Sequence, residues 1–410
     1  MLVYVLAAVG GFIALNFAFK KDPKPVNGVY SQPGKLYTLK YWFFYFLFNI
    51  RRWRNERANA STDVAGYGRK SRNSVEDMEK PQKLPQEHPK AVDAVYFNGG
   101  NANDDFFVTA TARRHDNLVQ TILMLRLSDI GLFELPCLPD TNIYVKDGTK
   151  FGTDNLIIEC VEAMKKWKIK YDGKMRFTNK DKEVKEVNVK FDLDWTATTP
   201  FFDFDTDMHW KTLCDAMARE KWSTEFFDQL RSAHQTHYEQ FGKIEGTFDI
   251  EGVGEKTLSF SGVRDHSYGN VRNWYDLYRY AMQYLTLSDG TSILVGHICM
   301  MPTFKRLIVG YVIHPDERID VVESCDLELY KWGEDGEDPE VFDFNFKAGD
   351  KNYHLECRRL DSVRFYMGID WSARIHERFC KFVVNGVEGW GISEWDYRRD
   401  GGNPNLKPKE

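Results

Sequence analysis

Residues 280–300 read YAMQYLTLSDGTSILVGHICM, two apolar stretches joined at Asp289-Gly290. Both stretches are rich in the β-branched and aromatic residues that strands favour. Asp-Gly is a strong hairpin signal, because glycine adopts the positive φ that a tight turn between two strands requires. The sequence therefore predicts an antiparallel hairpin with strands over residues 280–287 and 291–300.

Similar short runs lie on both sides of this hairpin, with turn pairs such as Asn385-Gly386 between them. They cover residues 106–111, 119–127, 142–145, 156–161, 167–171, 184–195, 306–313, 319–329, 342–346, 353–359, 374–384 and 390–397. Helical spacing occurs between the two halves, over 207–219 and 224–238, where Ser223 is a suitable N-cap. The strand-like runs do not alternate with helical segments in the way that βαβ units require, which argues against a parallel doubly wound sheet. We therefore predict a mainly β chain with two tandem antiparallel barrels or sandwiches and a helical insert.

Length and composition divide the chain further. At 410 residues it exceeds the size, about 250–300 residues, at which a single core stops growing. We expect six parts: an apolar segment at 1–20, a basic and aromatic segment at 21–58, a flexible linker at 59–92, an N-terminal domain at 93–255 with helices at about 207–238, a C-terminal domain at 256–400, and a tail at 401–410.

The first part is typical of a membrane anchor. Leu2 to Phe19 are eighteen residues without a formal charge, long enough at about 1.5 Å per residue to cross the hydrocarbon of a bilayer. No basic residue precedes them and no A-x-A site follows, so an uncleaved helix is favoured over a cleaved signal peptide. Positive charge follows at Lys20-Lys21, which predicts a single-pass endomembrane protein with a cytoplasmic body. A lumenal or secreted protein is the alternative.

The second part reads YWFFYFLFNI over residues 41–50, followed by Arg51-Arg52-Trp53-Arg54. Ten residues are too few to span a bilayer, but aromatic rings beside basic residues suit the headgroup region. The alternative is a helix packed on the globular body. Residues 20–57 contain nine Lys and Arg and two acidic residues, which gives this segment a charge of +7. Because the whole chain has a net charge of −6, the rest of the chain carries −13. We therefore expect a membrane as partner and no nucleic acid.

Residues 262–269, GVRDHSYG, place an arginine, a carboxylate and an imidazole side by side. On a strand, Arg264 and His266 point to one face, and Asp265 and Ser267 point to the other. Charged groups are costly to bury singly. The cluster is therefore either a structural ion-pair knot or a functional site.

Two other polar clusters have metal-ligand character. The alternating aspartates of residues 203–207 precede His209, and His234 and His237 are three residues apart on the predicted second helix. Helix capping explains the aspartates better than a hard cation, and a hydrogen-bonded structural role explains the histidines better than a metal. Seven scattered cysteines show no zinc spacing, and no phosphate-binding loop is present. We expect neither a metal nor a cofactor.

Residues 262–269, followed by Val271-Arg272 and Trp274, resemble the G-x-R-D-H-S-W/Y-G-x-R-D-W signature of a large β family. That family includes fungal survival-factor-type lipid-binding proteins, bacterial AttH-like proteins and carotenoid hydratases of the hydroxyneurosporene synthase type. The nearest likeness is to uncharacterised animal proteins labelled phosphoenolpyruvate synthase-like, and it covers about residues 90–398. Their runs at 234–240 and 389–395 look like those of this chain. One residue is added before Arg272, and Asn273 replaces an aspartate of the signature.

The resemblance implies two lipocalin-like domains with the signature near their junction. In the hydratase and cyclase relatives, acidic and histidine residues of the cavity act on a hydrophobic polyene or isoprenoid. Asp265 and His266 are the positions here that match, as acid and proton relay. The ligand contacts expected beside them are Arg264, Tyr268, Arg272, Trp274, Trp390 and Glu394.

Three functions are compatible with these features. The first is a membrane-tethered protein that holds a lipid or isoprenoid in a β-barrel cavity, which aromatic residues would line. The second is a hydratase, isomerase or cyclase that uses Asp265 and His266 on an apolar substrate. The third is a scaffold in which Arg264, Asp265 and His266 pin two domains together without a ligand. The phosphoenolpyruvate synthase label finds no support, because the chain lacks a nucleotide-grasp domain and a phosphohistidine domain.

Overall fold

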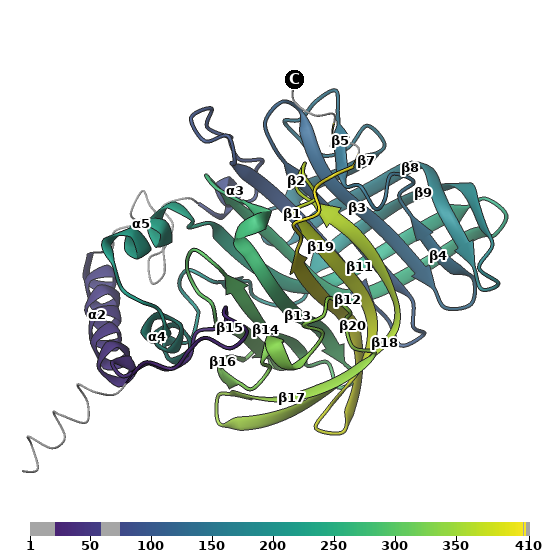
Figure 1. Cartoon of the computed structure of the whole chain (residues 1–410). Coiled ribbons are helices and arrows are strands. Elements are labelled where there is room, and N and C mark those ends of the chain that lie inside the picture. Colours follow the sequence, from purple (N-terminus) through teal and green to yellow (C-terminus); the bar gives the residue numbers. More distant parts are fainter. Residues whose placement is uncertain (1–20, 59–73, 405, 407–410) are drawn as a thin grey trace, which may run out of the picture.

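The computed structural model describes residues 21–58, 74–404 and 406, and these residues are mainly in antiparallel strands (Figure 1). The predicted hairpin is confirmed as β13 (Leu277–Leu287) and β14 (Ser292–Met300), with Tyr284 opposite Leu294. Gly290 in its turn has a φ of 88°, the positive value that the Asp-Gly pair predicts. The prediction of a mainly β chain is confirmed as well.

The first twelve strands form one N-terminal sheet. They are β1 (Val92–Gly100), β2 (Phe106–Arg113), β3 (Leu118–Leu127), β4 (Gly131–Glu134), β5 (Asn142–Tyr144), β6 (Phe151–Gly152), β7 (Leu156–Glu162), β8 (Lys166–Asn179), β9 (Val184–Ala197), β10 (Phe202–Asp203), β11 (Thr236–Ile250) and β12 (Gly254–Gly269). Strands β11-β12-β1-β2-β3-β4-β8 pair in that order, and β9 pairs with both β8 and β11. The pairing therefore returns on itself, and the sheet has an inner and an outer face.

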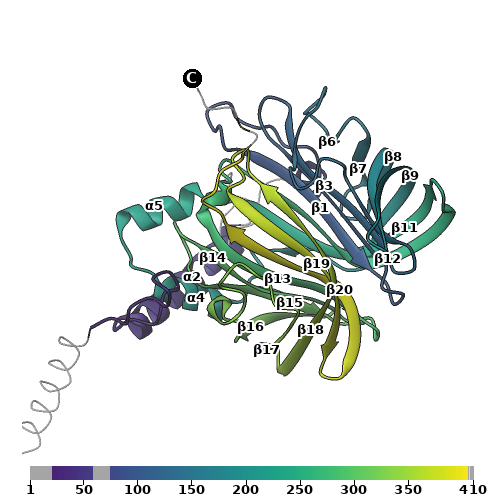
Figure 2. The same ribbon diagram turned by 45° about the vertical axis from the view of Figure 1, so that its right-hand side comes forward.

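The last eight strands form a closed C-terminal barrel. They are β13, β14, β15 (Leu307–Ile313), β16 (Ile319–Cys325), β17 (Val341–Ala348), β18 (Lys351–Met367), β19 (Ala373–Val384) and β20 (Val387–Arg398). Each strand pairs with its neighbour in sequence, and β20 pairs with β13 to close the barrel. The N-terminal sheet and the C-terminal barrel lie side by side in both views (Figures 1 and 2).

Both interiors are filled by large side chains. Trp167, Trp195, Phe97, Phe191 and Phe248 are buried inside the N-terminal sheet, and Phe342, Phe344, Phe346, Tyr353 and Trp395 are buried inside the barrel. The outer faces of the two bodies also pack on each other, since the rings of Phe202 and Tyr311 stack with centroids 4.3 Å apart. Strands at this junction are therefore buried on both faces.

The helices are α2 (Tyr37–Ala58), α3 (Val75–Met78), α4 (Trp210–Arg219) and α5 (Thr224–Ser232), with short 3-10 turns at Trp274–Asp276 and Leu329–Lys331. Three of the helices, α2, α4 and α5, lie on one side, and α3 lies apart from them next to the N-terminal sheet (Figure 1). The cap at Ser223 is confirmed, because its Oγ accepts a hydrogen bond from the Phe226 N–H at 3.1 Å. The predicted second helix extends too far, because residues from Thr236 onward pair with β12 as part of β11. Tertiary pairing overrides local helix propensity there.

The other boundaries differ from the expected ones in two places. The expected domain boundary at 255/256 falls at the start of β12, which pairs with β11 and β1 of the N-terminal sheet. The described part of the expected flexible linker, residues 74–91, is anchored on the body, because Met78 and Glu79 are buried and Glu79 pairs with Arg264. The predicted anchor at 1–20 and the linker residues 59–73 lie outside the described residues. Within the described chain, no helix combines the length and apolarity needed to cross a bilayer.

Candidate active site

Strand β12 sorts the polar cluster into two sets, as the alternation of a strand predicts. Arg264 and His266 point to the inner face of the N-terminal sheet, where they contact Glu79, at the end of α3, and residues of β1 and β11. Asp265 and Ser267 point to the outer face, toward the C-terminal barrel. The four consecutive residues therefore serve two separate environments.

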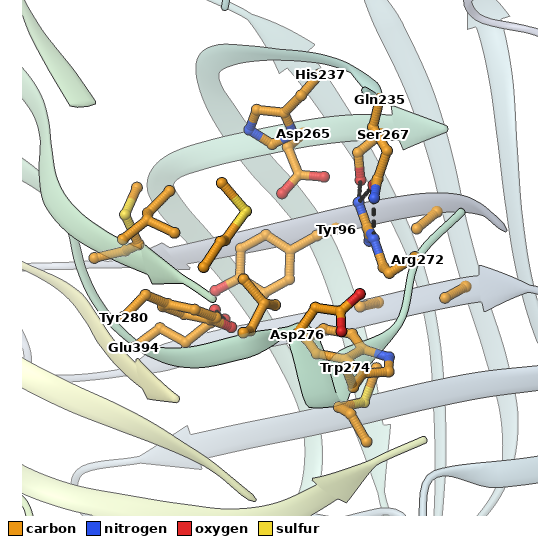
Figure 3. Close-up of a pocket in the computed structure, with 18 of the residues that line it drawn as sticks. Tyr96, Gln235, His237, Asp265, Ser267, Arg272, Trp274, Asp276, Tyr280 and Glu394 are labelled. Atoms are coloured by element: carbon orange, nitrogen blue, oxygen red, sulfur yellow. Dashed lines mark hydrogen bonds between the residues drawn. The ribbon is translucent and has the colours of Figure 1, made fainter. Parts of the chain in front are cut away.

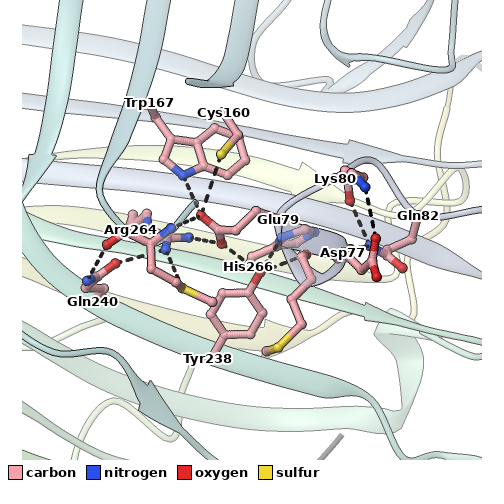
Figure 4. A network of polar contacts seen from close by, with 12 residues as sticks. Asp77, Glu79, Lys80, Gln82, Cys160, Trp167, Tyr238, Gln240, Arg264 and His266 are labelled. Carbon is pink, nitrogen blue, oxygen red and sulfur yellow. Dashed lines mark hydrogen bonds and ion pairs between the residues drawn. The ribbon is translucent and has the colours of Figure 1, made fainter. Parts of the chain in front are cut away.

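The inner set is a closed network of buried polar groups (Figure 4). Arg264 Nη1 donates to Glu79 Oε1 at 2.8 Å, and its Nη2 donates to Gln240 Oε1 at 2.9 Å. His266 Nε2 lies 2.7 Å from Asp93 Oδ1, and its Nδ1 lies 2.8 Å from the Tyr238 hydroxyl. The charges are paired and buried, the arrangement that an ion pair needs to be tolerated in a protein interior. This network supports a structural role for Arg264 and His266.

The outer set borders a pocket of about 340 Å³ between the N-terminal sheet and the C-terminal barrel (Figure 3). Its lining comes from β1, β2, β3, β11 and β12 on one side and from β13, β14, β15, β18, β19 and β20 on the other, with α5 at the edge. Apolar side chains dominate, among them Ile122, Leu230, Met282, Met300, Val309 and Ile375. The pocket thus lies between the two bodies. The sequence instead predicted a cavity inside one of the barrels.

Asp265 is the carboxylate on the N-terminal wall of this pocket. Among the residues that the structure describes, it has no hydrogen-bond or ion-pair partner. Burial raises the pKa of its carboxyl to about 7, against the lowering effect of His237 and Arg272, and Glu239 and Glu394 raise it further. A carboxyl group in this condition changes its protonation state near neutral pH.

His237 lies beside Asp265 on the same wall (Figure 3). Its Nε2 is 3.0 Å from Glu239 Oε1, and the Tyr311 hydroxyl donates to Glu239 Oε2 at 2.9 Å. Burial lowers the pKa of His237, but the hydrogen bond to Glu239 and the charges of Asp265 and Glu239 outweigh it, so the net pKa is raised. The imidazole therefore binds its proton more tightly than a solvent-exposed histidine does.

A second pair of carboxyl groups belongs to the barrel wall. Glu394 on β20 borders the pocket and lies directly opposite Glu377 on β19. The Tyr280 hydroxyl donates to Glu394 Oε1, and the Tyr96 hydroxyl donates to Glu377 Oε1 at 2.6 Å. Burial raises the pKa of both groups, and Glu394 raises that of Glu377 further, whereas Glu377 lowers that of Glu394. Glu377 is therefore the member of the pair that holds its proton more tightly.

Arg272 contributes a cation to the edge of the pocket. It donates to Ser267 Oγ at 2.8 Å through Nη2 and to Gln235 Oε1 at 2.8 Å through Nε. Its guanidinium lies over the ring of Trp274, 5.9 Å from the centroid. These contacts hold the side chain in a fixed orientation, with its charge available to a polar group of a ligand.

The structure thus brings four of the predicted site residues to the pocket: Asp265, Arg272, Trp274 and Glu394. The lining does not include the other four, Arg264, His266, Tyr268 and Trp390. The sequence interpretation did not single out Glu377, the partner of Glu394 across the strands, and it placed His237 on a helix. The structure gives no metal site at the pair His234 and His237 or at the aspartates of 203–207. Among the described residues, no group of three or more His, Cys, Asp or Glu side chains is arranged to hold an ion.

A family model described as "Family of unknown function (DUF8627)" matches residues 4–397. The chain belongs to this family. The match spans both bodies of the DUF8627 chain and the pocket between them. A comparison with curated proteins finds no match.

Several solved structures resemble the DUF8627 chain at low identity. An AttH-type protein from Nitrosomonas europaea has a TM-score of 0.47 and 11% identity, over 78% of this chain and 97% of its own. CghA with Sch210972 has a TM-score of 0.47 and 9% identity, over 83% and 97%. Kievitone hydratase from Nectria haematococca has a TM-score of 0.44 and 14% identity, over 82% and 95%.

Proposed function

We propose that this protein is an enzyme that transfers protons to and from a small, largely apolar molecule bound between the N-terminal sheet and the C-terminal barrel. Isomerisation, hydration and cyclisation belong to this class of reaction. The observation that carries the proposal is Asp265, a carboxyl group without a partner among the described residues, facing an apolar pocket with a pKa of about 7. Such perturbed groups in clefts are typical of acid–base catalysts.

Asp265 in its protonated form can donate its proton to a double bond or a carbonyl oxygen of the substrate. The carboxylate that remains lies near His237 and Arg272, whose charges lower its pKa and so stabilise it. Glu394 on the opposite wall, held by Tyr280, can accept a proton from a second substrate atom when Glu377 is the protonated member of the pair. Donation on one side and acceptance on the other shift a double bond without net loss of a proton, which is an isomerisation.

Binding of a lipophilic molecule without chemistry is the second candidate, and the apolar lining favours it. A volume of about 340 Å³ suits a small molecule in either case. A carrier has no need for two sets of titratable carboxyls on facing walls, because burying such groups opposes binding of an apolar ligand. We therefore favour the enzyme.

The test is deuterium incorporation. The purified full chain is incubated in D₂O with an extract of apolar small molecules, and the compounds that it retains are analysed by mass spectrometry. We expect retained compounds to gain deuterium at carbon with the unaltered chain and not with Asp265→Asn. The control is Asp172→Asn, which changes an exposed carboxylate on the N-terminal sheet. Retention of a compound without deuterium gain would identify a carrier.

A further inference from the structure

Helix α2 is apolar on two opposite sides. Its inner side packs on α4, where the ring of Tyr45 lies 4.5 Å from that of Trp210 and Phe48 is buried. The Tyr37 hydroxyl donates to Asp215 at 2.5 Å, and Lys40 Nζ donates to the Glu220 carbonyl at 2.6 Å. These contacts fix the helix on the body, and they fix which side faces outward.

The outer side carries a stripe of large apolar residues: Leu39, Trp42, Phe43, Phe46, Leu47 and Trp53, each between 43% and 68% exposed. Their spacing of three, four and seven residues places them along one face of the helix. A helix on the surface of a globular protein normally buries its apolar stripe and exposes polar residues. A contiguous exposed apolar surface of this kind marks an interaction site.

We propose that this stripe of α2 docks on the surface of an anionic lipid bilayer, with its rings at the level of the lipid headgroups. Tryptophan and phenylalanine on one helix face beside basic residues are typical of helices that lie in the membrane interface. Lys35 precedes the stripe, and Arg51, Arg52 and Arg54 follow it. Residues 2–19, which carry no formal charge, precede this segment in the sequence.

Charge favours lipid over a second copy of the chain as the occupant. Residues 20–57 carry +7, whereas the remainder carries −13. Two copies that met through their α2 stripes would bring two basic segments together and repel each other. An anionic bilayer attracts the same segment, at about 1 kcal/mol for each Lys or Arg near the surface. The proposal goes beyond the proposed function and is independent of Asp265.

The experiment uses tryptophan fluorescence of the full chain with vesicles of brominated phosphatidylcholine and phosphatidylserine, since bromine quenches only rings that enter the bilayer. Trp42→Phe removes a reporter and keeps the stripe apolar. We expect it to lose about half of the lipid-dependent quenching, and Trp42→Phe with Trp53→Phe to lose nearly all of it. Trp332→Phe, in the C-terminal barrel, is the matched control and should leave the quenching unchanged. Because each variant is compared in the full chain, residues 1–20 are the same throughout.

Other outcomes would overturn the proposal. If Trp42→Phe and the control variant are quenched equally, α2 does not enter the bilayer. If Leu39→Gln with Phe46→Gln turns a dimer into a monomer in sedimentation without vesicles, the occupant is a second copy. For a bilayer, this pair of substitutions should instead reduce quenching of Trp42 several-fold, and vesicles of phosphatidylcholine alone should quench less than the anionic ones.

Discussion

Asp265 on β12 lies directly opposite Glu239 on β11, yet the two carboxylates have different environments. Glu239 is bound by His237 and by the Tyr311 hydroxyl, whereas Asp265 has no partner among the described residues. Burial, only partly offset by the charges of His237 and Arg272, raises the pKa of Asp265 to about 7. Pairs of neighbouring carboxyl groups with different pKa values, caused by different environments, are typical of acid–base sites.

Activity should depend on protonated Asp265. If Asp265 donates a proton, the rate should be high below a pH of about 7 and fall as pH rises through that value. Asp265→Asn should lower kcat by about 10² to 10⁴, since positioned acid–base groups contribute that factor. The pH–rate profile of deuterium incorporation measures both effects. A profile that is flat between pH 5 and 9 would contradict the role of Asp265.

Asp265 should also make folding stability depend on pH. Its folded pKa lies above the ordinary value of 3.8, so the folded state binds the proton more tightly than the unfolded state does. The contribution is fully present below a pH of about 4 and is lost as pH rises to about 7, at most about 4 kcal/mol for a shift of this size. Asp265→Asn should remove this slope and raise stability at pH 8. Urea unfolding at several pH values measures the free energy, with Asp172→Asn as the control.

The inner network should matter for stability instead of chemistry. Arg264→Met would leave Glu79 buried without its cation, and breaking a buried pair costs about 3–5 kcal/mol. Lys174→Met removes an exposed ion pair with Glu186 and should cost about 1 kcal/mol or less. Denaturant unfolding compares the two. Equal losses would show that the Arg264 pair contributes no more than a surface pair.

Part of this organisation could be predicted from the sequence, because it depends on neighbouring residues. The alternation at 264–267 fixed which residues share a face, and the Asp-Gly pair at 289–290 located a hairpin. The Ser223 cap is equally local. These features need only the period of a strand or the chemistry of a turn.

The rest depends on contacts between distant residues. Glu79 is 185 positions from Arg264 in the sequence, within a stretch that has no apolar period. Strands β1 and β11 were missed because β1 is buried throughout and β11 begins inside a helix-like pattern. The pocket lies on the outer faces of strands whose two faces are both buried, so hydrophobic alternation could not show which face a ligand meets. Glu377 became a site residue only through its register with Glu394.

The carboxyl pair on the barrel wall gives the last prediction. In Glu377→Leu the carboxyl group opposite Glu394 is gone, together with the interaction by which it lowers the pKa of Glu394. The pKa of Glu394, which burial already raises, should therefore rise further. If Glu394 accepts the proton in the reaction, the acidic limb of the pH–rate profile should move to higher pH. Glu377→Gln keeps a neutral polar group of the same size and should leave the limb in place, as should Glu388→Gln, an exposed residue on β20. An unmoved limb in Glu377→Leu would mean that the pair takes no part in proton transfer.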